Sequence, residues 1–507
     1  EVVEPTETVT EEVTEEIPLV TEEIPETTEE EGPKLTYHDV DVDASKFAVK
    51  RSVPVNKGAI PASYDLRDHG WVSPVKDQNP YGTCWSFALM ATAESNILYQ
   101  QLESDPDLSE LQMAYWMYNR TTDPLGLTKG DKTTVEEGFL DAGGNDYLAT
   151  FALAGGLGYV DEELAPYTLA LQMGPNVRLK SRLAYQSNSY RLTEAKWMYM
   201  SDTDTVKEAL MNGGAVAVSY YHSEVFLKYI WDQEEVTEAV YNSAQHHKGS
   251  TNHAVTLVGW DDNFDRNKFD TKPSANGAWL IKNSWGENWG KDGYFWISYE
   301  DMSLMSSLAC QYTVVKADEN ENIYQYDGTI SPSTYLNANS HAISAANVYT
   351  ATRNEVLHSA GFFTDADNVD YTVSACLLNG NPSDPEDATL CLETSGTAEV
   401  PGYHEVELNS PMNIEKGQAF SIIVTLTPDE NSDDHAYMYV NESGDYGWIS
   451  FTNKVTAGTS YIYNFLGEGT WDDISNMCRA EARIKAYTYA APDYDYAHID
   501  VDPKLNV

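Results

Sequence analysis

The pattern of apolar and polar positions divides this chain into segments of different structure. An apolar run starts at Cys84 and continues through Trp85-Ser86-Phe87-Ala88, which predicts a helix that begins at the cysteine. A β-branched run from His253 to Trp260 predicts a strand. Residues 1–33 repeat Glu, Thr, Val and Pro without one basic residue, so we expect a disordered acidic spacer there. Helical and strand-like patterns therefore alternate only after this spacer.

The pattern changes again after Asp318, where short β-rich runs recur between turn residues. This spacing is typical of an antiparallel β-sandwich. We expect strands at 324–328, 345–349, 358–363, 371–376, 402–408, 419–426 and 480–487.

The chain is long enough for two or three domains, since a domain averages about 150 residues. We expect an α+β domain followed by an all-β antiparallel sandwich. The expected boundaries are 1–33 for the spacer, 34–59 for a short proregion or linker, 60–317 for the first domain, 318–490 for the sandwich and 491–507 for a tail.

Composition excludes several classes of partner. A net charge of −49 argues against binding to nucleic acid or to an anionic membrane. No run of 18 apolar residues exists, so we expect no membrane span. The chain begins at Glu1 instead of methionine, which fits a signal peptide already removed from an extracellular or cell-surface protein. No stretch has the spacing of a zinc site or an EF-hand loop, so we expect no metal and no other cofactor.

The candidate chemistry centres on Cys84. A helix N-terminus favours a thiolate, which is the nucleophilic form of cysteine. A cysteine nucleophile also needs a histidine, a residue that orients this histidine, and donors for an oxyanion. His253 heads the predicted strand, and Asn283 follows thirty residues later within Ile281-Lys282-Asn283-Ser284-Trp285. Gln78 lies six positions before Cys84, so its amide and the Cys84 N–H are the candidate oxyanion donors.

These motifs resemble the papain family of cysteine peptidases. Further matching segments are 60–68, 72–78, 108–110, 143–144, 165–167, 214–218 and 283–294, so the resemblance covers about residues 60–315. It implies a two-lobed fold, with a helical lobe and a β-barrel-like lobe.

The resemblance also implies a role for each matching residue. Cys84 attacks the peptide carbonyl, His253 transfers the proton, and Asn283 orients His253, while Gln78 binds the oxyanion. The resemblance places five residues at the substrate cleft: Trp85, Gly143, Gly144, Ala254 and Trp285. Trp285 shields the Asn–His hydrogen bond, and the glycines offer backbone to an extended substrate. Ala254 and residues near Val218 and Ser219 form a pocket that favours apolar side chains.

The sequence also departs from the family pattern. Tyr81 and Ala142 stand where the family has a pair of bridged cysteines, so this disulfide cannot form. Longer loops are expected at 121–135, 171–188 and 232–250, and the last one is a candidate for shaping the cleft.

The sandwich resembles the lectin-like, jelly-roll domains that follow papain-like domains in exported proteins of anaerobic bacteria and archaea. Trp448 and Trp471 are candidates for stacking on a sugar, and a packing role for this domain stays open. Cys376 and Cys391 flank a loop; a bridge is open, but two buried free thiols are the favoured interpretation in a chain with five cysteines. The other two cysteines outside the site, Cys310 and Cys478, are expected in the core.

The sequence thus predicts a secreted bacterial thiol protease, an endopeptidase that acts as a monomer on protein or peptide substrates. Carbohydrate or cell-wall glycan is a second candidate partner. Two alternatives stay open: a catalytically silent adhesin, and an exopeptidase that uses the same residues.

Overall fold

The computed structural model describes residues 59–337, 340–380, 383–429 and 435–491. The expectations for the acidic spacer, for residues 34–58 and for residues 492–507 fall outside this part of the chain. None of the helices in the described ranges has the length and apolar character needed to cross a membrane.

Helices dominate the first part of the described chain. The main helices are α1 (Cys84–Tyr99), α2 (Glu110–Tyr118) and α3 (Asp146–Ala154), and shorter ones are α4 (Thr168–Met173), α5 (Arg182–Tyr185), α6 (Thr203–Gly213) and α7 (Met302–Met305). Single 3₁₀ turns are η2 (Leu66–His69), η3 (Glu162–Leu164), η4 (Gly174–Asn176), η5 (Glu224–Phe226) and η6 (Arg266–Lys268).

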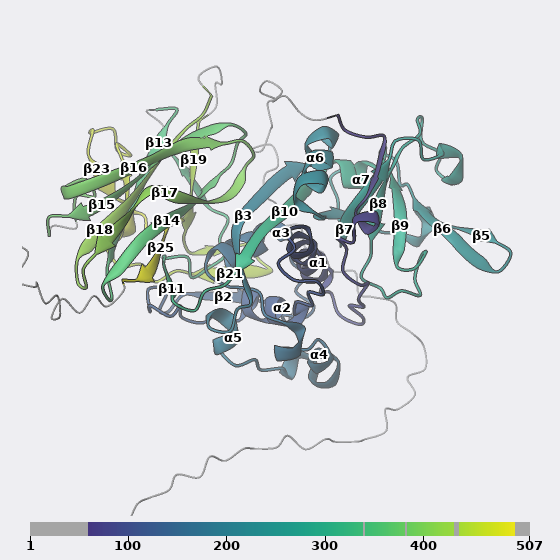
Figure 1. The fold of residues 1–507 in the computed structure, drawn as a ribbon, viewed down its shortest axis with the longest axis horizontal. Coiled ribbons are helices and arrows are strands. Elements are labelled where there is room, and N and C mark those ends of the chain that lie inside the picture. Colours follow the sequence, from purple (N-terminus) through teal and green to yellow (C-terminus); the bar gives the residue numbers. More distant parts are fainter. Residues whose placement is uncertain (1–58, 338–339, 381–382, 430–434, 492–507) are drawn as a thin grey trace, which may run out of the picture. The chain divides into compact units, whose positions relative to one another are not determined.

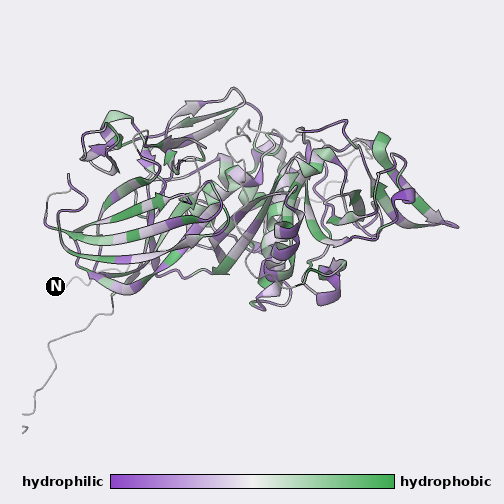
Figure 2. Cartoon of the chain, turned by 90° about the horizontal axis from the view of Figure 1, so that it is seen from above, coloured by the Kyte–Doolittle hydropathy of each residue, from purple (hydrophilic) through white to green (hydrophobic). Residues whose placement is uncertain are grey.

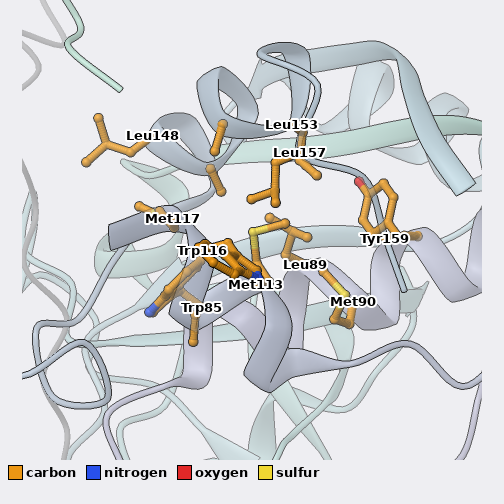
Figure 3. Close-up of a cluster of buried hydrophobic side chains, with 14 of the residues drawn as sticks. Trp85, Leu89, Met90, Met113, Trp116, Met117, Leu148, Leu153, Leu157 and Tyr159 are labelled. Carbon is orange, nitrogen blue, oxygen red and sulfur yellow. The ribbon is translucent and has the colours of Figure 1, made fainter. Parts of the chain in front are cut away.

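The core of the helical lobe is a continuous apolar cluster between α1, α2 and α3. Figure 3 shows Trp85 and Leu89 of α1 beside Met113 and Trp116 of α2, with Leu153 on the far side. Two of these helices begin at a side-chain cap: Ser109 accepts from the Gln112 N–H, and Asn145 accepts from the Leu148 N–H at 2.7 Å. The cluster fixes the direction of α1 and so places Cys84 at its N-terminus.

The strands of the first part form the other lobe, with the exception of β2 (Lys132–Val135), which lies in a separate sheet. The others are β1 (Ser63–Asp65), β3 (Tyr190–Tyr199), β4 (Val216–Tyr220), β5 (Leu227–Asp232), β6 (Glu235–Tyr241), β7 (His253–Asp261), β8 (Ala278–Lys282), β9 (Tyr294–Ser298) and β10 (Leu308–Lys316). Most of them follow one another in the order β3-β10-β4-β7-β8-β9-β6-β5 (Figure 1). Within the expected loop at 232–250, residues Glu235–Tyr241 form strand β6, which pairs with both β5 and β9, and the residues after it are loop.

The second part of the chain is all β apart from the short helix α8 (Ile474–Met477). Its strands are β11 (Glu321–Tyr324), β12 (Thr334–Leu336), β13 (Ile343–Thr350), β14 (Glu355–Thr364), β15 (Val369–Leu378), β16 (Ala388–Ala398), β17 (Gly402–Ile414), β18 (Ala419–Thr427), β19 (Tyr437–Asn441), β20 (Gly444–Asp445), β21 (Ile449–Thr452), β22 (Ser460–Tyr463), β23 (Trp471–Asp473), β24 (Glu481–Ala482) and β25 (Lys485–Ala490). One sheet has the order β16-β15-β18-β13-β22-β23, and β11-β25-β14-β17 forms the opposing layer.

Apolar and hydrophilic residues are interleaved along the sandwich strands (Figure 2), as a sheet with one buried face requires. In β15, Val373 and Ala375 face the core between the layers, whereas Cys376 belongs to a smaller cluster on the other face. The expected α+β part followed by an antiparallel sandwich is confirmed.

Four local expectations were wrong. The run 324–328 is strand only up to Tyr324, and the run 480–487 is split between β24 and β25. Cys376 and Cys391 form a disulfide, because β15 and β16 pair in a register that places them opposite each other. Cys391 is bridged and exposed, so the favoured interpretation of two buried free thiols is wrong. Cys478, which was expected in the core, is only half-buried. Cys310 lies in the core as expected, at 2 % exposure.

Strand pairing joins the two parts of the chain. Gly402 to His404 of β17 pair with Lys196 to Glu194 of β3, so a single sheet runs through both parts. The expected loop at 121–135 contributes to the same junction, because β2 pairs with β21. The α3 end also contacts the second part, since the Gln325 side chain donates to the Gly155 carbonyl.

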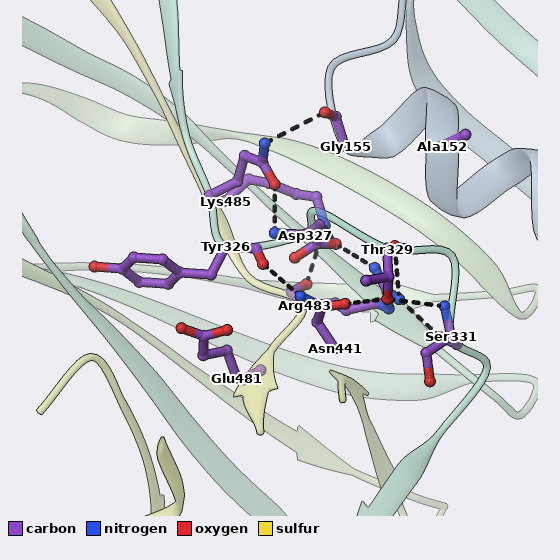
Figure 4. Close-up of polar contacts among 12 residues, drawn as sticks. Ala152, Gly155, Tyr326, Asp327, Thr329, Ser331, Asn441, Glu481, Arg483 and Lys485 are labelled. Atoms are coloured by element: carbon purple, nitrogen blue, oxygen red, sulfur yellow. Dashed lines mark hydrogen bonds and ion pairs between the residues drawn. The ribbon is translucent and has the colours of Figure 1, made fainter. Parts of the chain in front are cut away.

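A buried ion cluster lies at this junction (Figure 4). The Asp327 carboxylate accepts from Arg483 at 2.9 Å and from Lys485 at 2.5 Å, and all three side chains are fully buried. Arg483 also donates to the Thr329 and Ser331 carbonyls, and its guanidinium lies over the ring of Phe151 in α3. Two cations thus share one carboxylate, and burial lowers the pKa of Lys485 to about 8.

Candidate active site

His253 and Asn283 lie side by side at the junction of the two lobes. His253 is the first residue of β7, Asn283 directly follows β8, and these two strands are antiparallel neighbours. The Asn283 Oδ1 lies 2.8 Å from the His253 Nε2, which makes Nε2 the protonated nitrogen of the neutral ring. The other nitrogen, Nδ1, is buried and has no hydrogen-bond partner. It is the nitrogen left to exchange a proton with a nucleophile.

Trp285 covers this pair. Its ring is stacked on the His253 imidazole, with 4.5 Å between centroids and 20° between planes. Both residues are nearly inaccessible, His253 at 0 % and Trp285 at 8 % exposure. Because water is kept away from the His253–Asn283 hydrogen bond, this bond is stronger than an exposed one.

Cys84 is the first residue of α1 and is fully buried. Its thiol lies close to the backbone N–H groups of Ala254 and Trp85, which lower its pKa. Burial dominates, however, and raises the pKa of Cys84 to about 11; the Asp146 carboxylate raises it further. Burial likewise lowers the pKa of His253 to about 3. Burial therefore favours the neutral thiol and the neutral imidazole, against the thiolate expected from the helix N-terminus alone.

Gln78 is held rigidly beside Cys84. Its side-chain amide donates to the Tyr81 carbonyl at 2.9 Å and accepts from the Ser284 hydroxyl at 2.8 Å. The backbone carbonyl of Gln78 accepts from the Tyr167 hydroxyl, which also contacts the Thr83 hydroxyl at 2.6 Å. The Tyr167 hydroxyl therefore links the backbone at Gln78 to the start of α1. The second N–H of the Gln78 side-chain amide is left for an oxyanion.

Gly143 and Gly144 precede α3 and are buried. The Gly143 carbonyl accepts a hydrogen bond from the Tyr118 hydroxyl at 2.7 Å. A side chain at position 144 would place its Cβ 2.6 Å from the Trp85 ring, and the Gly144 φ of +157° disfavours any residue other than glycine. Trp85 is fully buried, so it acts on the cleft by supporting the Gly144 backbone. Ala254 is also fully buried and pairs with Ser219 across β7 and β4.

His222 is a site residue that the sequence analysis missed. Its ring lies edge-on to Trp285, with 4.8 Å between centroids, and 6.3 Å from the His253 ring. Its Nδ1 lies 2.8 Å from the Tyr220 hydroxyl and its Nε2 2.9 Å from the Glu224 carboxylate. His222 lies in no recognisable motif; its position two residues after a buried strand was the one available indication.

Buried charges behind the site were missed as well. Lys76 bonds to Glu94 at 2.9 Å and to Glu110 at 2.8 Å, and Lys282 bonds to Ser73, which in turn bonds to Glu94. Lys282 adjoins Asn283 in the chain, so this network anchors the end of β8. Among the described residues, no group of His, Cys, Asp and Glu is arranged to hold a metal ion.

The geometry can be compared with known proteins. Residues 60–315 match the papain family of cysteine proteases, and residues 323–488 match the lectin-like domain family. This chain belongs to the papain family of cysteine proteases. It combines the papain-like fold with a C-terminal lectin-like domain, which confirms the resemblance inferred from its motifs.

Two solved structures share both domains of this papain-family chain. One is the cysteine protease and lectin-like domains of Cwp84, a surface layer associated protein of Clostridium difficile, with 26 % identity, a TM-score of 0.71, and coverage of 87 % of this chain and 91 % of that one. The other is clostridial Cwp84 after propeptide cleavage, with 28 % identity, a TM-score of 0.69, and coverage of 85 % and 99 %.

Curated relatives match only the peptidase part. A cysteine protease of Blomia tropicalis is 25 % identical over 260 residues, which is 51 % of this chain and 67 % of that protein. Fruit bromelain of Ananas comosus is 28 % identical over 243 residues, or 47 % of this chain and 55 % of bromelain. The chain thus spans about half the length of fruit bromelain.

Proposed function

We propose that this chain is an exported cysteine endopeptidase that hydrolyses peptide bonds with Cys84, His253, Asn283 and Gln78. The observation that supports this most is the His253–Asn283 hydrogen bond beneath Trp285, at the junction where α1 presents the Cys84 thiol. A silent relative would need none of this arrangement, so the adhesin alternative is disfavoured.

The reaction follows from these positions. His253 Nδ1 takes the Cys84 proton, and the thiolate attacks the peptide carbonyl carbon. The amide N–H of Gln78 and the Cys84 N–H stabilise the oxyanion, and each such donor typically contributes about 3 kcal/mol. The His253 imidazolium then gives its proton to the leaving amine, which departs and leaves a thioester. His253 next removes a proton from water, whose oxygen attacks the thioester, releases the acid and restores the thiol.

The burial of the site sets a condition on this reaction. Burial favours the neutral forms of both Cys84 and His253. The helix N-terminus opposes this by favouring the thiolate. We propose that the polar backbone of a bound substrate stabilises the separated charges, so that the reactive ion pair forms when substrate binds.

The accessory domain belongs to the lectin-like family, and the neighbouring Cwp84 is associated with a surface layer. We propose that this domain binds carbohydrate or cell-wall glycan and holds a monomeric, exported enzyme at the cell surface. Trp448 and Trp471 are half-buried and keep part of each ring accessible for stacking. Sedimentation of the Cys84→Ala protein with insoluble peptidoglycan tests this; protein that stays in the supernatant would contradict it. The boundaries 60–317 and 318–490 are part of the same proposal.

The peptidase is tested by mass spectrometry after reaction with an epoxysuccinyl probe, together with turnover of an end-blocked fluorogenic peptide. We expect one adduct, on Cys84, and loss of turnover in Cys84→Ala. Cys478→Ala is the matched control, since Cys478 is a free, half-buried thiol in the accessory domain. An adduct on Cys478 alone, with no turnover, would reject the peptidase. Cleavage restricted to peptides with free ends would favour the exopeptidase.

A further inference from the structure

A row of aromatic rings leads away from the catalytic histidine. Trp285 lies 4.5 Å from His253, and Trp289 lies 5.0 Å from Trp285, measured between ring centroids. The row continues with Tyr229 at 6.5 Å from Trp289 and ends with Trp231 at 6.5 Å from Tyr229. An apolar path therefore connects the reaction centre to the hairpin formed by β5 and β6.

Ring contact carries the row toward the surface. The rings of Tyr229 and Trp231 in β5 lie 6.5 Å apart between centroids, although the pairing of β5 with β6 shifts register between Ile230 and Trp231. Ile230, between them, packs on the opposite face against the Phe264 and Phe269 cluster. Trp231 is 59 % exposed near the turn, and the hairpin is joined to the rest of the sheet at its other end, where Val240 and Tyr241 of β6 pair with β9. Figure 1 shows β5 and β6 reaching beyond β9 at the end of the sheet. An exposed tryptophan on an anchored hairpin is typical of a binding surface.

In the described part of the chain, the hairpin also has a free strand edge and a negatively charged turn. Strand β5 is the last strand of the sheet order, so within the described chain its outer edge has no strand partner. Such an edge can pair with an extended peptide. The turn is acidic, because Asp232, Glu234 and Glu235 are all exposed there. A basic side chain next to an apolar one would complement this combination of charge and aromatic surface.

We propose that the β5–β6 hairpin binds the substrate on the C-terminal side of the bond that is cut, and that it selects an aromatic or aliphatic side chain followed by a basic one. This inference rests on the proposed peptidase function. The occupant is the substrate, because the row of rings is continuous with His253. It is the C-terminal side, because the family resemblance assigns the pocket at Ala254 and Ser219 to the second side chain before the cut bond, and β5 lies on the other side of β7 from β4 in the sheet order.

The spacing sets the length of substrate that is needed. Trp231 lies three ring-to-ring steps beyond Trp285, which an extended peptide spans with about six residues, since a strand rises about 3.3 Å per residue. Peptides that end one or two residues after the cut cannot reach Trp231.

The test compares two internally quenched peptides with the same N-terminal half. The short peptide ends two residues after the cut, and the long one continues for eight residues with Leu-Phe-Lys near the sixth. The measured quantity is the ratio of kcat/KM for the long peptide to that for the short one. We expect Trp231→Ala to lower this ratio about tenfold, the effect of losing a well-packed tryptophan contact. Trp231→Phe should restore most of it.

Leu466→Ser is the matched control, because Leu466 is 58 % exposed but belongs to the accessory domain. It should leave the ratio as in the wild type. A ratio in Trp231→Ala equal to the wild-type ratio would overturn the proposal, as would equal losses on both peptides, which indicate damage to the fold. Failure of the wild type to cut either peptide rejects the peptidase function itself, and this inference with it.

Discussion

The reactivity of Cys84 depends on opposing effects at one residue. The α1 N-terminus and nearby backbone N–H groups favour the thiolate, whereas complete burial and Asp146 oppose it. Asp146 is the first residue of α3 and is 5 % exposed, and its Oδ1 has no hydrogen-bond partner. Burial raises the pKa of Asp146 to about 7, so its charge changes near neutral pH. Asp146 is thus placed to modulate the nucleophile.

Asp146→Asn should make Cys84 more reactive. Removing a negative charge near the thiol lowers the pKa of Cys84. The measurement is the rate of Cys84 alkylation by iodoacetamide between pH 6 and pH 10, followed by mass spectrometry; the curve should shift to lower pH. Asp161→Asn, an exposed carboxylate at the start of η3, is the control. Identical curves for Asp146→Asn and the wild type would show that Asp146 does not act on the thiol.

At the scale of elements, the helices and strands that depend on local sequence alone were predicted correctly. The helix at Cys84 and the strand at His253 follow from an unbroken apolar run and a β-branched run, and motif spacing placed His253 beside Asn283. Pairing between distant edges was not predictable, because the residues of β3 and β17 carry no signal of their partner. The Cys376–Cys391 bridge depends on the register of β15 and β16, which the alternation of side chains alone did not specify.

Asp327 links elements of both domains, so its loss should destabilise both. Asp327→Asn leaves Arg483 and Lys485 buried without a counter-charge, and breaking a buried pair in this way typically costs about 3–5 kcal/mol. Because one sheet runs through β3 and β17, we expect a single calorimetric transition at lower Tm in the variant. Glu319→Gln, an exposed neighbour in sequence, is the control. Two separate transitions, with only one of them shifted, would refute this coupling.

For the whole molecule, buried carboxyl groups and excess negative charge both lower the stability of the folded chain as the pH rises. Burial raises the pKa of Glu162 and of Glu481 to about 8. Between about pH 4.5 and pH 8 these groups hold protons in the folded chain but not in the unfolded one. Folding then binds protons, so the free energy of unfolding falls as pH rises through this range. Repulsion within a chain of net charge −49 grows over the same range as carboxyl groups ionise.

Buried histidines lower the stability of the folded chain at acidic pH. Burial lowers the pKa of His253 to about 3 and that of His404 to about 4, so both stay neutral in the folded chain. In the unfolded chain they gain protons below about pH 6.5, which reduces stability as the pH falls further. The two effects oppose each other between about pH 4.5 and pH 6.5, so the loss of stability caused by the carboxyl groups is unopposed by the histidines above about pH 6.5.

Thermal unfolding should therefore show a Tm at pH 8 that is lower than at pH 6 by about 3 °C or more. Adding 0.5 M salt separates the two causes, because salt screens surface repulsion but acts little on a buried carboxyl group. The part of the Tm decrease that persists in salt is caused by buried groups such as Glu481. Glu481→Gln should therefore reduce this part, whereas Glu468→Gln, at an exposed position, should not. A Tm that rises from pH 6 to pH 8 would show that these carboxyl groups are ionised in the folded protein at pH 6.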